Sequence, residues 1–292
     1  MKLQKVYIEI TNICGLNCFF CPPSHKKSQI MTLNFFDKVC FQAKDITKEI
    51  YLHIMGDPLV LSNIGEYLDI AYKYNLKVNI TTSGFYVEAS KYDLLIHKAV
   101  KQLNISLNSF NANTTDKSFD EYISNILNFC KFKINGTNNI FVNLRLWNID
   151  KENSASDYNA KIFSKLKNFF EIKELNISDK NIRLDNKVKL CFDEYFDWPS
   201  LENDYFEEQG FCLGLSSQIG ITCDGTVVPC CLDKDAVINL GNLHIQNLKE
   251  ILNSQKAKNI IQGFKNNSAI EELCQKCSYK KRFTSSFALK EV

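Results

Sequence analysis

The sequence predicts an α/β protein in which a parallel sheet with outer helices precedes a small α+β unit with a β-hairpin. Over the first two thirds of the 292 residues, short β-rich runs alternate with longer amphipathic runs, which is typical of parallel strands covered by helices. In the last third, Asp224-Gly225 separates two β-rich runs, a strong hairpin signal. Most of the 12 cysteines gather near the two ends of the chain, which indicates two metal sites.

Five strands and five helices are predicted to alternate in the first part. Residues 33–47 show the helical pattern, because Phe36, Val39 and Ala43 share one face and Thr32 can cap the first turn. Residues 172–190 offer a sixth strand. The predicted strands are 6–10, 50–55, 76–81, 103–107 and 140–146, and the predicted helices are 33–47, 64–74, 92–100, 118–132 and 157–169.

The second part is predicted to be smaller and organised differently. An acidic and aromatic stretch at 191–209 links it to the first part, and a basic run at 280–282 is expected to be a solvated tail. The predicted domains are 1–190, a linker at 191–209, and 210–292. The predicted hairpin strands are 218–222 and 226–228, and the helices are 246–253 and 255–264.

The composition sets broad limits on location and partners. A hydrophobic fraction of 45% and a charged fraction of 23% are ordinary for a soluble enzyme. The net charge of +2 gives no general reason to expect nucleic acid or a membrane as partner. No apolar run has the length of a signal peptide core or a membrane span. We therefore expect a cytoplasmic protein whose cysteines ligate metal rather than form disulfides.

Three cysteines directly follow the first predicted strand, at C-x3-C-x2-C spacing: Cys14, Cys18 and Cys21. Each can ligate a different iron of one cubane cluster, which leaves the fourth iron open to an exogenous ligand. His25 lies four residues after Cys21, so a zinc site with three thiolates and one imidazole is the alternative.

This loop, with the aromatic Phe20 just before its last cysteine, resembles the cluster loop of the radical S-adenosylmethionine (SAM) superfamily. The resemblance implies a partial (β/α)6 TIM-like barrel and a [4Fe-4S] cluster whose open iron binds SAM. It also implies an external electron donor such as flavodoxin or ferredoxin. In barrels of this kind the chemistry lies at the carboxyl ends of the strands.

Other predicted strand ends extend the resemblance. Residues 55–58, Met-Gly-Asp-Pro, resemble the superfamily's Gly-Gly-Glu-Pro motif, in which Gly56 allows close backbone approach and Asp57 faces the ammonium of SAM. A simple strand-ending turn is the alternative. Ser83 follows the third strand, and Ser106 and Asn108 end the fourth. Polar groups there suit ribose and carboxylate contacts, although solvated loop residues would look the same.

Arg145 lies within the fifth predicted strand, where a cation needs an anionic partner. The resemblance implies that this partner is the methionyl carboxylate of SAM, and a structural ion pair is the alternative. His53, on the second strand, is expected to be a hydrogen-bonded core residue rather than a proton donor. The isolated Cys40, Cys130 and Cys191 are expected to pack in the core.

The second cysteine set resembles the auxiliary-cluster domain of SPASM and twitch radical SAM enzymes. Its predicted ligands are Cys212, Cys230 and the knuckle Cys274-x2-Cys277. No cysteine follows Cys277, so the shorter twitch form with one additional [4Fe-4S] cluster fits better. Cys231 could replace Cys230, and a four-thiolate zinc ribbon would use the same set.

Together these features predict a radical SAM oxidoreductase. The resemblance implies reductive cleavage of SAM to a 5′-deoxyadenosyl radical, which abstracts hydrogen from a small molecule or peptide held between barrel and C-terminal domain. A second cluster with four protein thiolates has no open iron, so we expect it to relay electrons. The alternatives are a peptide-modifying maturase and a zinc-binding scaffold without catalysis. No motif names the substrate.

Overall fold

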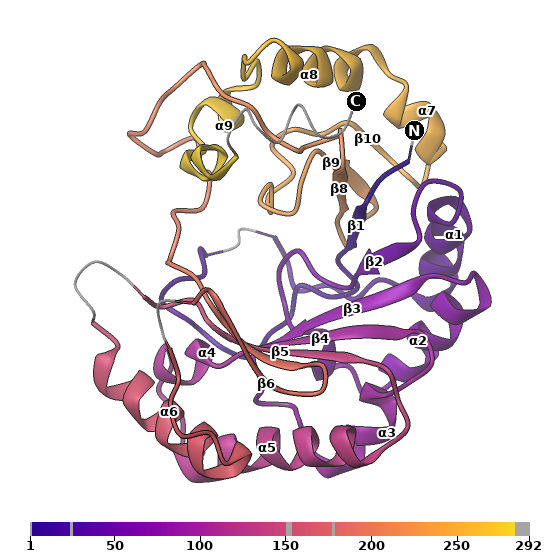
Figure 1. Ribbon diagram of the computed structural model, residues 1–292. Coiled ribbons are helices and arrows are strands. Elements are labelled where there is room, and N and C mark those ends of the chain that lie inside the picture. Colours follow the sequence, from indigo (N-terminus) through magenta and orange to yellow (C-terminus); the bar gives the residue numbers. More distant parts are fainter. Residues whose placement is uncertain (1, 24–25, 150–153, 177–178, 284–292) are drawn as a thin grey trace.

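A single mixed sheet of ten strands forms the centre of the molecule (Figure 1). The computed structural model describes residues 2–23, 26–149, 154–176 and 179–283. The strands are ordered β10-β9-β8-β1-β2-β3-β4-β5-β7-β6, and those from β8 to β7 run parallel. Their bounds are β1 Lys5–Ile8, β2 Glu49–Tyr51, β3 Lys77–Thr82, β4 Val100–Ser106, β5 Phe141–Leu146, β6 Asn181–Asp185, β7 Val188–Phe192, β8 Gln218–Ile221, β9 Thr226–Val228 and β10 Gly241–Asn242.

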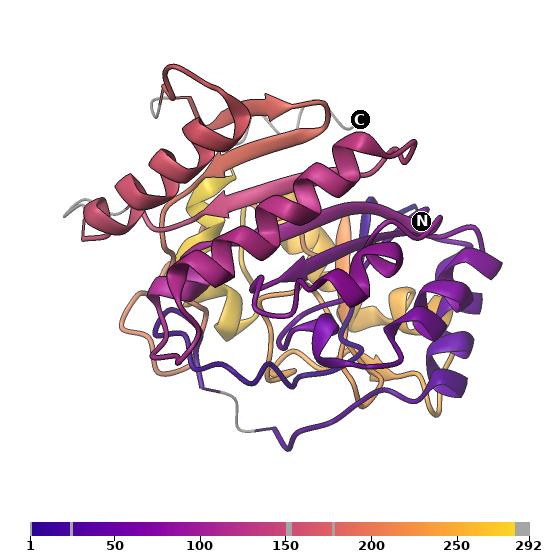
Figure 2. The same ribbon diagram turned by 90° about the horizontal axis from the view of Figure 1, so that it is seen from below.

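Helices cover the outer face of the curved sheet, and a smaller group lies over β8–β10 (Figures 1 and 2). Thr32 and Ser118 cap the first turns of α1 and α5 through their side-chain oxygens. The helices are α1 Leu33–Ala43, α2 Ile64–Lys73, α3 Tyr92–Leu95, α4 Asn108–Asn111, α5 Phe119–Asn135, α6 Ser156–Phe170, α7 Leu248–Leu252, α8 Gln255–Lys265 and α9 Glu272–Gln275, with 3-10 turns η1 Pro58–Val60, η2 Ala89–Lys91 and η3 Ser278–Arg282.

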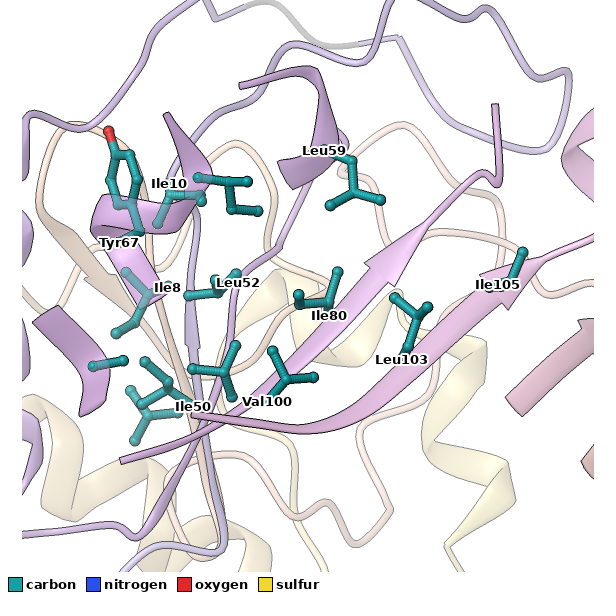
Figure 3. Close-up of a cluster of buried hydrophobic side chains, with 14 of the residues drawn as sticks. Ile8, Ile10, Ile50, Leu52, Leu59, Tyr67, Ile80, Val100, Leu103 and Ile105 are labelled. Carbon is teal, nitrogen blue, oxygen red and sulfur yellow. The ribbon is translucent and has the colours of Figure 1, made fainter. Parts of the chain in front are cut away.

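Side chains alternate along the strands, so that apolar residues lie on the outer face of the sheet and polar residues on its inner face. On β1, Val6 and Ile8 are fully buried among the hydrophobic residues, whereas Lys5 and Tyr7 line an interior cavity. Figure 3 shows Ile8 in the outer core with isoleucines and leucines of β2, β3 and β4 and with Tyr67 of α2. Burial of this layer against the helices stabilises the sheet and leaves the inner face free for polar side chains.

The predicted α/β class and most elements are confirmed, but several bounds differ. The second strand is only three residues long, because the chain leaves the sheet after Tyr51. Residues 92–100 do not form one helix: α3 ends at Leu95, and Val100 already pairs with β3. The sixth parallel strand is β7, which pairs with β5, and β6 folds back onto it as an antiparallel edge that the sequence did not reveal.

The hairpin of the C-terminal part belongs to the same sheet as the barrel strands. β8 pairs in parallel with β1 over four residue pairs, from Lys5–Gln218 to Ile8–Ile221. The turn Asp224-Gly225 is formed as predicted, with Gly225 at a φ of 81°. The sheet therefore continues across the predicted boundary at residue 210. None of the helices in the described part of the chain has the length and apolar composition of a membrane-spanning helix.

Candidate functional site

The cysteine loop is held in place at both of its ends. Thr11 forms a β-bridge with Ile30, and its hydroxyl donates to the Gln29 carbonyl at 3.0 Å. The turn after β2 packs directly onto this stem: Gly56 has a φ of 76°, and a Cβ there would lie 2.4 Å from the Thr11 carbonyl oxygen. Only glycine fits this approach. The loop is thus fixed at the carboxyl edge of β1 and β2.

Polar contacts from neighbouring loops reach the cysteines themselves. The Tyr86 hydroxyl donates to the Cys14 carbonyl at 2.6 Å, and a Cβ on Gly15 would collide with the same hydroxyl. The Asn113 side chain donates to the Cys18 sulfur at 2.9 Å and accepts from the Asn17 amide at 2.8 Å. These partners, which follow β3 and α4 in the chain, orient the loop, and no motif in the sequence pointed to them.

The three thiols of the loop lie close enough to influence one another. Cys18 and Cys21 share a hydrogen bond, which lowers the pKa of Cys18 to about 6. Burial, the carboxylate of Asp57 and the neighbouring Cys18 raise the pKa of Cys14 to about 12. Each ionised thiol raises the cost of ionising its neighbours. All three can therefore be thiolates together only when a cationic centre is bound between them. His25, the predicted alternative ligand, lies outside the described residues.

The contacts of Asp57 differ from the predicted contact with the ammonium of SAM. Its side chain is 1% exposed, and one carboxylate oxygen accepts from the Thr82 hydroxyl and from the Ser83 amide and hydroxyl, each at 2.8 Å. The other oxygen accepts from the Leu59 amide at 3.0 Å. Both oxygens are therefore engaged with protein donors, and the carboxylate joins the loops after β2 and β3 instead of facing a ligand. Ser83 is committed to the same network.

The interior of the sheet contains a cavity of about 460 Å³, a size suited to small ligands. Four of the residues predicted to bind SAM line it, together with the predicted cluster ligand Cys21: Phe20, Ser106, Asn108 and Arg145. Gly56, Asp57 and Ser83 are not among its lining residues, because they form the supporting layer beneath the cysteine loop. The linker closes the open side through Tyr195, whose ring stacks on Phe20 at a centroid distance of 5.5 Å.

His53 also lines this cavity, which contradicts the expectation of a hydrogen-bonded core residue. Its Nδ1 atom is buried, and no described group forms a hydrogen bond with it. Burial, together with the nearby charge of Arg145, lowers the pKa of His53 to about 3. The imidazole is therefore neutral at pH 7, with one buried nitrogen that has no protein partner among the described residues. Cys191 is also half-buried beside Arg145, whereas Cys40 and Cys130 pack in the core as predicted.

The second set of thiols lines a separate, small cavity. Cys212, Cys230, Cys274 and Cys277 all contribute to its wall, together with hydrophobic side chains such as Leu273. Burial raises the pKa of all four thiols, that of Cys212 to about 11. As with the first set, only a cationic centre can hold them together as thiolates. These four residues could hold a metal cluster.

Cys230 and its neighbour Cys231 point in different directions. Cys230 lines the cavity of the second thiol set, whereas Cys231 lines the barrel cavity and forms a hydrogen bond with Tyr7. The structure thus groups Cys230 with the other three thiols, and Leu232 and Tyr279 line both cavities. Cys223 lies elsewhere: its amide donates to Glu9, which also accepts from the Met55 amide.

A buried lysine completes the second thiol site, which corrects the prediction of a solvated basic tail. Lys280 is 4% exposed and donates to the carbonyl oxygens of Glu207, Cys274 and Gln275. It thereby donates hydrogen bonds to carbonyl groups at the carboxyl end of α9 and places a positive charge beside the thiols. Lys280 is followed by Arg282, which forms an ion pair with Asp193 of the linker at 2.9 Å.

Comparison with protein families identifies the chain. The family model "Radical SAM superfamily" matches residues 8–155, and the model "SPASM: Iron-sulfur cluster-binding domain" matches residues 212–278. The chain belongs to the radical SAM superfamily. It also carries a SPASM domain, so a [4Fe-4S] cluster, SAM and further iron–sulfur are the cofactors of this radical SAM enzyme. A search of curated proteins finds no match.

Solved structures share the fold of this radical SAM enzyme at low sequence identity. BtrN in complex with AdoMet and 2-DOIA is 16% identical with a TM-score of 0.61, and the match covers 95% of this chain and 94% of BtrN. The anSMEcpe structure with bound AdoMet is 17% identical with a TM-score of 0.59, covering 94% and 86%. Streptococcus suis SuiB bound to precursor peptide SuiA is 16% identical with a TM-score of 0.55, covering 96% and 72%.

The residues of the chain fit the cofactors of the superfamily. The loop offers three thiols beside a cavity whose polar wall contains Ser106 and Asn108. The second cavity offers four thiols and a neighbouring ammonium, with no further polar ligand required. Three donors in one loop match a cluster with one open iron, and four donors around one small cavity match a cluster whose irons are all ligated by protein.

Proposed function

We propose that this radical SAM enzyme is an oxidoreductase that removes hydrogen from a small molecule held in the barrel cavity. When bound, the first cluster and SAM would supply a 5′-deoxyadenosyl radical, and the second cluster would accept the electron that the substrate loses. The proposal depends mainly on the opposite orientations of Cys230 and Cys231. Since Leu232 and Tyr279 line both the thiol cavity and the barrel cavity, an electron has a short path between them.

We assign the ligands from the two thiol sets. Cys14, Cys18 and Cys21 would hold the first cluster, and the second would be held by the four thiols of the C-terminal cavity, in the twitch arrangement: Cys212, Cys230, Cys274 and Cys277. We propose that Phe20, Ser106 and Asn108 contact SAM, because they line the barrel cavity near the cysteine loop. Gly56 and Ser83 would act indirectly by fixing the position of that loop.

The chain's own residues would exclude solvent from the reaction. The stacked rings of Phe20 and Tyr195 join the cysteine loop to the linker across the mouth of the cavity. Phe19 contacts the same tyrosine at 5.4 Å, edge to face. An external donor such as flavodoxin or ferredoxin would deliver the electron that starts each turnover. We place the protein in the cytoplasm, where such donors and a reducing environment are present.

The test is SAM cleavage by the reconstituted enzyme. Protein loaded anaerobically with iron and sulfide, then reduced and given SAM, should form 5′-deoxyadenosine. The Cys18→Ala variant should form none, and Cys40→Ala, which removes a thiol from the core, should match the wild type. Absence of 5′-deoxyadenosine from fully loaded wild-type protein would refute the proposed activity.

Iron content separates this enzyme from a zinc scaffold. Two four-iron clusters correspond to about eight irons per chain and a brown colour. A scaffold with the same cysteines would instead carry zinc and be colourless. Purification without oxygen followed by elemental analysis decides between them, and a His25→Ala variant that keeps its metal would count further against a zinc site in the loop.

A peptide-modifying maturase is the second candidate. An outer cavity of about 830 Å³ adjoins the barrel cavity and shares Phe20, Cys21 and Tyr195 with it, so an extended chain could reach the cysteine loop. Streptococcus suis SuiB, one of the structures with this fold, is bound to a precursor peptide. If small molecules fail as substrates while a peptide encoded beside this gene is consumed, the maturase is correct.

A further inference from the structure

Arg145 is a partly buried cation without an acidic partner among the described residues. It projects from β5 into the barrel cavity, and burial lowers its pKa. In the described part of the chain, no carboxylate forms an ion pair with it and no group forms a hydrogen bond with it. Its guanidinium lies 4.7 Å from the ring centroid of Trp147, which supplies a stacking surface. A buried charge of this kind requires an anion to compensate its loss of hydration.

The groups that interact electrostatically with Arg145 come from three barrel strands and from the C-terminal domain. They are Tyr7 of β1, Tyr51 of β2, Cys191 of β7 and Tyr279 of η3. All four are neutral in their ordinary state at pH 7. None belongs to the cysteine loop, whose own electrostatic neighbours are different residues such as Asp57. Arg145 therefore has Tyr279 of the C-terminal domain among its electrostatic neighbours, while Phe20 and Cys21 of the loop line the same cavity.

The other charged residues that line the cavity leave its wall with a net positive charge. Lys5 also lines it, 6.0 Å from the centroid of the Tyr51 ring, and Glu194 of the linker is the only carboxylate among the described lining residues. His53 stays neutral because its pKa is about 3. The cavity wall thus contains two cationic side chains and one carboxylate, and this net positive charge favours a ligand that is negatively charged.

We propose that Arg145, supported by Lys5, is the binding site for an anionic group of the substrate. The substrate would therefore be a small carboxylate or phosphate compound, whose anion pairs with the guanidinium while its body contacts the surrounding tyrosine rings. This deepens the proposed function, since it rests on the barrel cavity being the substrate site. It replaces the predicted role of Arg145 as partner of the SAM carboxylate.

Calorimetry on the cluster-loaded enzyme with saturating SAM tests the proposal directly. The probes are benzoate and phenyl phosphate, with benzamide as the neutral match to benzoate. At least one anion should bind, and benzamide should bind at least tenfold more weakly. Arg145→Gln should weaken anion binding by about 30-fold or more, as for truncation of a buried charge partner. Arg145→Lys should retain part of the anion affinity. Whether benzoate or phenyl phosphate binds more tightly distinguishes a carboxylate substrate from a phosphate substrate.

Two controls separate this site from nonspecific anion binding and from a contact with SAM. Arg183→Gln removes an exposed arginine of β6 and should leave anion binding unchanged. Lys5→Gln should lower anion affinity more mildly than Arg145→Gln. The SAM affinity of Arg145→Gln, measured without substrate, should fall by less than its anion affinity, because the guanidinium is assigned to the substrate anion.

The results that would overturn the proposal are distinct from failure of the proposed function. Binding of neither anion, or equal binding by Arg145→Gln, would refute the anion site. Competition between SAM and benzoate, together with loss of SAM binding in Arg145→Gln, would return the residue to the SAM carboxylate. A wild type that binds anions but never cleaves SAM would instead refute the radical function and leave the anion site standing.

Discussion

The two thiol sites of this protein differ in how the chain builds them. The N-terminal site takes three cysteines from eight consecutive residues, and one of them, Cys21, is exposed. The C-terminal site collects four cysteines from three separate segments around one small cavity. A local loop can leave a coordination position open beside a ligand cavity, whereas ligands from distant segments close around their cluster. This difference is why we assign SAM cleavage to the N-terminal site and electron transfer to the C-terminal site.

The largest effect should come from the open site. Cys18→Ala removes the thiol that Asn113 orients, so 5′-deoxyadenosine formation should fall to background. The fold should persist, because the loop is held by its stem at Thr11 and Gly56 rather than by the thiol. Product chromatography and thermal unfolding measure the two effects. Unchanged product formation would show that this loop does not hold the SAM-cleaving cluster.

Paired substitutions at 230 and 231 sharpen the comparison at the closed site. Cys230→Ala should lose about four irons per chain and lower the unfolding temperature, because its cluster links three segments of the domain. Cys231→Ala should keep all of its iron, since this side chain faces the barrel cavity. Iron analysis and thermal melts decide. The reverse pattern would mean that Cys231 is the ligand and that the separation between the two cavities is misassigned.

Glycine substitutions test whether the open site depends on close backbone packing. Gly56→Ala places a Cβ 2.4 Å from the Thr11 carbonyl oxygen at a positive φ, which should cost about 1–3 kcal/mol. Gly65→Ala in α2 is the matched control, because its Cβ meets only a flexible leucine tip at 3.1 Å and alanine favours a helix by about 1 kcal/mol. Chemical denaturation measures both. Equal stability of the two variants would contradict the packing argument.

The effect that is smallest at neutral pH, and grows only on acidification, is the pH dependence that His53 gives to stability. Its pKa is about 3 in the folded protein and about 6.5 when unfolded, so the unfolded chain takes up the proton first. Stability is therefore fully present above about pH 6.5 and falls as pH drops toward 3. His53→Leu should remove about 1 kcal/mol of this loss per pH unit. Denaturation of the wild type and of His53→Leu at several pH values should show the difference in slope.

The sequence predicted the features that depend on local patterns. Cysteine spacing, strand–helix alternation and the turn Asp224-Gly225 are all encoded within a few residues, and the structure and family matches agree with them. Long-range pairings carry no such signal. For this reason β8 beside β1, the antiparallel β6 and the burial of Lys280 were missed.

Side-chain direction limited the prediction of the cavity wall. Asp57 and Ser83 follow strand ends, as site residues in barrels do, yet their side chains bond to each other beneath the loop. Arg145 was recognised as unusual for a strand and His53 was expected to be a hydrogen-bonded core residue. Whether Arg145 has a partner depends on residues of β1, β2, β7 and η3, which no local pattern reveals. Asn113 and Tyr86 act through contacts far along the chain, which no motif records.

The central claim is that one cluster site is open to SAM and the other is closed. Mössbauer spectra of the iron-loaded enzyme, recorded with and without SAM, test it most directly. SAM should change the signal of one iron in a single cluster, the change should survive in Cys230→Ala, and Cys18→Ala should abolish it. A SAM-dependent change that vanishes in Cys230→Ala but persists in Cys18→Ala would contradict the account.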